Sequence, residues 1–143
     1  LYGAAIDPAG TGYAAWIDEA VTPRPRTIYH ETKLRAEQLL RSYGEAGALA
    51  VTILRMSRCF PEPVPAMALY RLYRGIDARD AASAHERALE TFARGGVRMF
   101  VVSAPTPFEP RDCELLARDA PAVLRRRVPG LVAAFERRGW GLP

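Results

Sequence analysis

Two short apolar runs predict strands that are buried on both faces. "AVTILR" (50–55) and "VRMFVVS" (97–103) are each nearly continuous in apolar and β-branched side chains. Such runs are typical of strands in a parallel sheet that is covered on both sides. Helical patterns precede and follow both runs, and this order predicts the α/β class with parallel strands.

Helical periodicity predicts the elements around the strands. The first helix is expected to begin at Thr27 or Ile28, after the prolines of "TPRP" (22–25), and to end at Gly44 or Gly47. A later helix is expected from an Asp80 cap to about Phe92, where "RGG" ends it. Shorter helices are predicted over 66–74, 111–118, 121–127 and 130–138.

The first predicted helix has two unlike faces. The spacing places mostly apolar and aromatic residues on one of them: Tyr29, Lys33, Ala36, Leu40 and Tyr43, with Leu39 beside them. Polar residues lie largely opposite: Arg35, Gln38, Arg41 and Ser42.

Two strands are fewer than a doubly wound domain needs. The chain begins at Leu1 and opens on the turn-rich stretch "LYGAAIDPAGTGY". We therefore expect the chain to be a fragment, with the remaining strands upstream of Leu1.

Composition narrows the class of protein only slightly. Of the 143 residues, 49% are hydrophobic and 25% charged, as in ordinary soluble domains. The sequence shows neither a membrane-spanning run nor a signal peptide, so we expect a cytoplasmic protein without a membrane partner. Cys59 and Cys113 are expected to be reduced thiols, because they form no CxxC pair.

Charge and histidine spacing do not indicate a metal or nucleic-acid site. The net charge is +4, which favours anionic partners without identifying one. His30 and His85 lack metal-ligand spacing, so no metal site is predicted. The "RRR" run at 125–127 is explained by the preference of cations for a helix C-terminus, so no nucleic-acid partner is expected.

One positively charged residue stands apart from the others. The chain has 20 lysines and arginines, and Lys33 is the only lysine. It lies four residues after Tyr29, so the two side chains share a helix face. A free tyrosine has a pKa of about 10, and a nearby ammonium favours the phenolate, which can then exchange protons with a substrate. Tyr-x-x-x-Lys alone is a weak motif that also occurs by chance.

The context of this pair resembles a known family. "DEAVTPRPRTIYHETKLRAEQLL" (18–40) resembles the pattern around the catalytic Tyr and Lys of the extended short-chain dehydrogenase/reductase family, the NAD-dependent epimerases and dehydratases. "LYG", "VTILRMS", "GIDARDAASAHERALE" and "MFVVSAP" resemble the family's other segments, in the same order, at 1–3, 51–57, 75–90 and 99–105.

The resemblance implies a fold, a chemistry and a set of residues. Residues 1–105 would be the C-terminal part of a Rossmann-like, doubly wound NAD(P)-binding domain, and 106–143 a helical substrate-side tail. Tyr29 would be the catalytic acid/base, and Lys33 would hold the nicotinamide ribose and favour the phenolate. Ser57 would contact the cofactor, NAD or NADP. The reaction would be hydride transfer at a carbinol or carbonyl carbon of a small-molecule substrate, sugar-like or anionic, with a homodimer as a further expectation.

Three departures from the family pattern shape the expectations. The Gly-rich phosphate loop and the Ser/Thr partner of the catalytic Tyr do not occur in the chain, so it should be inactive alone. Arg58 and Pro61 replace the family's Asn and Gly. Only residues 58–74 separate the strand from "GIDARD", which is short for a nucleotide-sugar lobe.

The arginines around this short loop admit two interpretations. Arg58 and Arg74 are candidate substrate ligands, with Arg71 and Arg79 nearby, either as a clamp on a carboxylate or phosphate or as solvated arginines. The alternative functions are a simple carbonyl reductase and a non-catalytic dinucleotide sensor on the same scaffold.

Overall fold

The structure is a computed structural model, and it describes residues 1–2, 12–91 and 96–142. Strands β1 (Val51–Met56) and β2 (Val97–Val102) pair in parallel, with Val51 opposite Val97 and Met56 opposite Val102. The predicted pair of adjacent parallel strands, and the mixed α/β class, are thereby confirmed. A parallel pair requires a crossover connection, and helices lie in the connection between β1 and β2.

The helices follow the predicted periodicity, with small differences in their ends. Those described are α2 (Ile28–Glu45), α3 (Val64–Tyr73), α4 (Ala78–Glu90), α5 (Cys113–Arg118), α6 (Ala120–Arg127) and α7 (Pro129–Arg137). The short 3-10 turn η2 (Pro110–Asp112) precedes α5, where the sequence predicted one continuous helix. In the described ranges, no helix combines the length and the apolar character needed to cross a membrane.

The predicted cap of α4 was wrong by one turn. Asp77 is the N-cap, and its Oδ1 accepts a hydrogen bond from the Arg79 N–H at 2.9 Å. Asp80 lies inside the first turn instead, where its negative charge still interacts favourably with the helix dipole. The predicted end at "RGG" lies partly outside the described residues, and α4 ends at Glu90.

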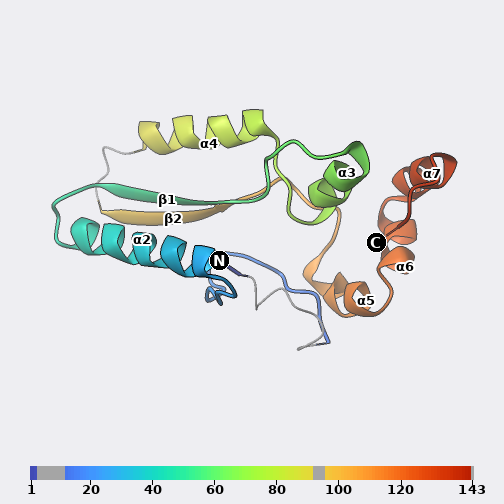
Figure 1. The fold of residues 1–143 in the computed structure, drawn as a ribbon, viewed down its shortest axis with the longest axis horizontal. Helices are drawn as coiled ribbons and strands as arrows, with labels where there is room; N and C mark the ends of the chain where they lie inside the picture. The colour runs from blue at the N-terminus through green and yellow to red at the C-terminus, as the bar shows by residue number, and fades with distance from the viewer. Residues whose placement is uncertain (3–11, 92–95, 143) are drawn as a thin grey trace.

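Helices cover both faces of the small sheet. Figure 1 shows α2 along one face and α4 along the other. Gly44 allows α2 to approach the strands closely, because a Cβ at this position would collide with the side chain of Val97 and lie 3.2 Å from Val51 Cγ2. Gly47 follows the helix in a left-handed conformation, with φ of 74°.

The face of α2 that meets the sheet is not the apolar face that the sequence indicated. Glu37 and Gly44 are the buried residues of the helix. Tyr29, Leu40 and Tyr43 are 63%, 44% and 50% exposed. At about 100° per residue, their stripe lies roughly a quarter-turn from the buried one, and it stays uncovered in the part of the chain described.

One edge of β1 carries no strand among the residues that the structure describes. The register directs the N–H groups of Val51, Ile53 and Arg55 toward β2, so those of the intervening residues point away from it. Within the described ranges the sheet contains only β1 and β2, and this second edge of β1 stays unpaired. An unpaired apolar strand edge readily pairs with another chain.

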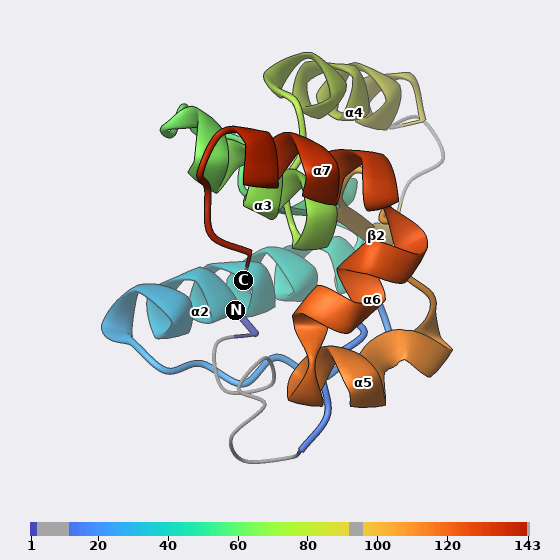
Figure 2. The ribbon, with the colours of Figure 1, turned by 90° about the vertical axis from the view of Figure 1, so that its right-hand side faces the viewer.

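A second cluster of buried side chains lies beyond the strands. Leu72 of α3 packs with Phe108, Val123, Leu124 and Val132. Figures 1 and 2 show α5, α6 and α7 stacked past the carboxyl ends of β1 and β2. The helices after residue 106 therefore share a core that is separate from the sheet.

Candidate functional site

Tyr29 and Lys33 lie in the first turns of α2. The side chain of Thr27 caps the helix by accepting a hydrogen bond from the His30 N–H at 3.4 Å. The cap fixes where the helix begins, so Tyr29 and Lys33 fall one turn apart on one face. The Lys33 Nζ atom lies 5.6 Å from the centroid of the Tyr29 ring. The predicted proximity of the amine and the phenol is present in the structure.

Both functional groups of this pair are accessible. The Tyr29 side chain is mostly exposed, and Lys33 is exposed as well. The Tyr29 hydroxyl and the Lys33 ammonium form no hydrogen bond with another residue of the described ranges. Figure 1 shows that α2 begins on the side where β1 and β2 have their carboxyl ends. Ligands of α/β sheets bind at that edge.

Ser57 lies at the same edge of the sheet. It follows β1 directly, and its backbone N–H donates to the carbonyl of Val102 at 2.8 Å. The hydrogen bond extends the parallel ladder by one residue beyond β1. Ser57 lies just past the end of β1, as the sequence predicted, and it is partly buried.

Arg58 and Arg74 are brought together around one tyrosine. Their guanidinium carbons lie 4.8 Å and 5.3 Å from the ring centroid of Tyr70. The Arg58 N–H donates to the carbonyl of Arg74 at 3.0 Å, so the two backbones are neighbours as well. The guanidinium of Arg58 also forms an ion pair with Glu62. Arg58 is therefore partly neutralised.

Arg71 and Arg79 both bind Asp77. The Arg71 Nη2 atom lies 3.1 Å from one carboxylate oxygen, and the Arg79 Nε atom lies 3.0 Å from the other. The hydrogen bonds from Arg79 and then Arg71 hold the pKa of Asp77 well below its usual range. These two arginines fix the cap of α4. A hollow of about 220 Å³ is lined by Arg58, Arg71 and Asp77, among others.

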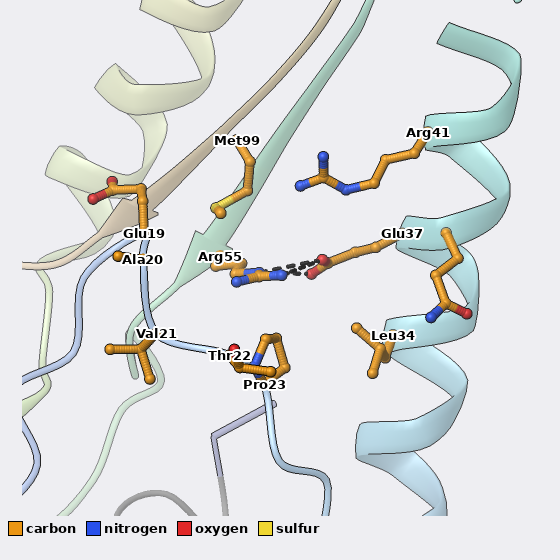
Figure 3. A pocket seen from close by; sticks show the side chains of 11 residues that line it. Glu19, Ala20, Val21, Thr22, Pro23, Leu34, Glu37, Arg41, Arg55 and Met99 are labelled. Atoms are coloured by element: carbon orange, nitrogen blue, oxygen red, sulfur yellow. Dashed lines mark hydrogen bonds and ion pairs between the residues drawn. The ribbon is translucent and has the colours of Figure 1, made fainter. Parts of the chain in front are cut away.

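A larger cavity, of about 350 Å³, lies beside the middle of α2. Figure 3 shows it between the loop at 19–23, the two strands and the helix. Within it, the Arg55 Nη2 atom lies 2.8 Å from Glu37 Oε2, and the Arg55 Nε atom donates to both carboxylate oxygens. The hydrogen bond to Glu37 raises the pKa of Arg55 above its ordinary value.

This cavity was missed by the sequence analysis. Its helix residues recur at three- and four-residue intervals, which is the spacing of a buried stripe: Leu34, Glu37, Gln38 and Arg41. The signal was obscured because charged and amide side chains occupy positions that a hydrophobic pattern assigns to solvent.

Among the described residues, Tyr29 and Lys33 carry the kinds of group that a ribose-binding site would use. Lys33 and Tyr29 offer an ammonium and a hydroxyl suited to a ribose and a reacting oxygen. Pyrophosphate binding needs a Gly-rich turn between a strand and a helix, and the chain has no such sequence. In the ranges described, no group of three or more His, Cys, Asp or Glu side chains is placed to hold a metal ion.

No protein-family model, no curated protein and no solved structure matches the chain.

Proposed function

We propose that the chain is part of an NAD(P)-dependent oxidoreductase of the epimerase/dehydratase type. In this proposal β1, β2 and their helices are the C-terminal part of a Rossmann-like sheet, and residues 106–143 are its substrate-side tail. The observation that supports the proposal is the Tyr29–Lys33 pair, whose amine lies 5.6 Å from the tyrosine ring centroid. The pair belongs to a helix that begins on the side of the carboxyl ends of β1 and β2 (Figure 1).

The chemistry assigned to this pair is proton transfer at a carbinol or carbonyl oxygen. In the oxidising direction, the substrate hydroxyl gives its proton to the Tyr29 phenolate oxygen as the carbinol carbon loses a hydride. The nicotinamide ring supplies the acceptor for that hydride when it is bound. In the reducing direction the Tyr29 hydroxyl returns the proton to the new alkoxide oxygen, so the charges balance in both directions.

Lys33 has two tasks in this scheme. Its positive charge lies beside Tyr29, whose oxygen carries negative charge in the proton transfer. Its three N–H donors, on a flexible stem, can also reach ribose hydroxyls. A planar guanidinium cannot be directed in the same way, which gives a reason for the single lysine in an arginine-rich chain. Ser57, which follows β1 directly, is assigned as a residue that contacts the cofactor.

The connection after β1 favours a small substrate. Between β1 and α4 the chain forms only α3, a helix of 10 residues. Such a short segment supports a simple carbonyl reductase as the second candidate. Arg58 and Arg74, whose guanidinium groups both lie beside the ring of Tyr70, are assigned as ligands of an anionic or sugar-like substrate.

Replacing Tyr29 with Phe tests the proposal. In the full-length protein, Tyr29→Phe removes the proton-transfer atom while keeping the ring, so turnover should fall by about 10²–10⁴-fold. Turnover is followed by nicotinamide absorbance against a panel of 4-keto sugars and small carbonyl compounds. Tyr43→Phe is the matched control, because Tyr43 is an exposed tyrosine on the same face of α2.

Two outcomes would contradict the proposal. The first is equal turnover in Tyr29→Phe and the parent protein. The second is binding of NAD or NADP without turnover on any substrate of the panel, which would instead support the non-catalytic dinucleotide sensor.

A further inference from the structure

The cavity beside α2 is separate from the proposed catalytic pair. Neither Tyr29 nor Lys33 lines it, and its walls come from the loop at 19–23, the middle of α2 and the two strands. Its volume of about 350 Å³ is in the range of pockets that hold small organic molecules.

One cation in the lining lacks an anion. Glu37 gives both carboxylate oxygens to Arg55, so their charges compensate each other. Arg41 lies one turn after Glu37 and is partly buried. It forms no hydrogen bond or ion pair with another residue in the described ranges. Figure 3 shows its side chain extended from α2 over the cavity. An anion in the cavity would offset the cost of this partly desolvated charge.

Glu19, the other acidic residue that lines the cavity, does not neutralise Arg41. Glu19 Oε1 accepts a hydrogen bond from the backbone N–H of Val101, on the outer edge of β2, at 2.9 Å. This hydrogen bond lowers the pKa of the Glu19 carboxyl, which stays ionised. Figure 3 shows the Glu19 carboxylate across the cavity from Arg41 and directed away from it.

The remaining walls are mostly apolar. Val21 and Pro23 come from the loop, Leu34 from α2 and Met99 from β2. Ligand pockets typically combine such walls with a few polar groups that fix orientation. Thr22 and Gln38 also offer polar groups, and the guanidinium of Arg41 is the charged group in the lining that can fix the orientation of an anion.

We propose that this cavity binds a small organic anion, a carboxylate on a short apolar chain, with Arg41 as the carboxylate ligand. Leu34, Pro23 and Met99 contact the apolar chain. The loop at 19–23 leads into the start of α2, so a ligand held between this loop and Arg41 stabilises the segment that precedes Tyr29. The site therefore adds a second ligand to the protein, outside the centre assigned to Tyr29 and Lys33.

Titration of the full-length protein with hexanoate tests the site. Hexanoate should bind saturably with a dissociation constant of about 1 mM, as expected for a ligand of this size. Binding is measured by ligand-observed NMR and by the rise in unfolding temperature. Hexylamine has the same chain and the opposite charge, and should not bind.

Two variants localise the binding. Arg41→Gln should weaken hexanoate binding at least tenfold. A cooperative unfolding transition of this variant, measured without ligand, shows that it is folded. Arg35→Gln removes an exposed arginine of the same helix and should bind as the parent does. Tyr29→Phe should also bind hexanoate normally, which separates this site from the proposed oxidoreductase centre. Unchanged affinity in Arg41→Gln, equal binding of hexylamine, or no saturable binding would overturn the proposal.

Discussion

Glu37 and Arg55 join α2 to β1 through a nearly buried ion pair. The Arg55 Nη2 atom lies 2.8 Å from Glu37 Oε2, and the side chains are only 8% (Arg55) and 11% (Glu37) exposed. The Tyr2 hydroxyl accepts a further hydrogen bond from Arg55 Nη1 at 2.7 Å. The arginine therefore ties the helix and the strand to a residue near the start of the chain.

Breaking this ion pair should be costly. In the full-length protein, Glu37→Gln leaves the Arg55 charge without its anion and should lower the free energy of unfolding by about 3 kcal/mol. Glu45→Gln, at an exposed site on the same helix, should change it by less than about 0.5 kcal/mol. Urea denaturation measures both. Equal effects would show that the pair does not hold α2 to the sheet.

Lys33→Arg should damage activity although it conserves the charge. The guanidinium keeps a positive charge beside Tyr29, but its planar fork does not replace an ammonium at a ribose. We expect turnover to fall and the Michaelis constant for NAD or NADP to rise. Steady-state kinetics of the full-length protein measures both. Full activity in Lys33→Arg would refute the role assigned to the amine.

Gly44→Ala should destabilise the contact between α2 and the sheet. The added Cβ meets the side chains of Val97 and Val51, so the cost should be about 1–3 kcal/mol. Gly130→Ala in α7 is the control, because no atom lies within 4 Å of a Cβ there, and it should be neutral or stabilising by up to about 1 kcal/mol. The midpoint temperature of thermal unfolding should therefore fall for Gly44→Ala and should rise or stay unchanged for Gly130→Ala.

Low pH should lower the stability of the C-terminal helices, because it protonates the carboxylate of Asp112. Burial alone would raise the pKa of this carboxyl, but hydrogen bonds from the Glu109 N–H and from Arg127 hold it below the ordinary value. Because the folded pKa is the lower one, the contribution is complete above about pH 3.8 and is lost as the pH falls through the folded pKa. Asp112→Asn should lack this acid-dependent loss. Parallel stability–pH curves for parent and variant would contradict the assignment.

The 143-residue chain alone should bind NAD and NADP poorly. It has no Gly-rich turn for the pyrophosphate, and within the described ranges β1 has an unpaired edge and α2 an exposed apolar stripe. We expect the isolated chain to be unstable or to associate, and calorimetric titration to show no saturable binding at micromolar concentrations. Micromolar binding by a folded monomer would place the cofactor site elsewhere.

The positions of the helices and strands could be predicted from the sequence better than the helix faces that pack against the sheet. The strands followed from continuous apolar runs, and the distance between Tyr29 and Lys33 followed from helical spacing. The inward face of α2 did not, because its buried residues are a charged glutamate and a glycine, which carry no hydrophobic signal. The partner of Glu37 is equally hidden, since Arg55 lies on a different element.

Predictions at loops failed for a related reason. Asp77 and Asp80 are both suitable caps, and only the backbone conformation decides between them. The approach of Arg58 and Arg74 to one ring depends on the path of the chain around α3, which no local pattern encodes. Their chemistry could be predicted from residue type, but their common position around Tyr70 could not.

The separate core of α5, α6 and α7 has a consequence for the order of folding. Its contacts are local in sequence, and the hydrogen bonds that Arg126 and Arg127 donate to Asp112 span only 14 and 15 residues. Pairing β1 with β2 closes a much longer loop, which costs more chain entropy before it forms any contact. We therefore expect the C-terminal helices to assemble early, with Leu72 joining their core when the crossover between the strands closes.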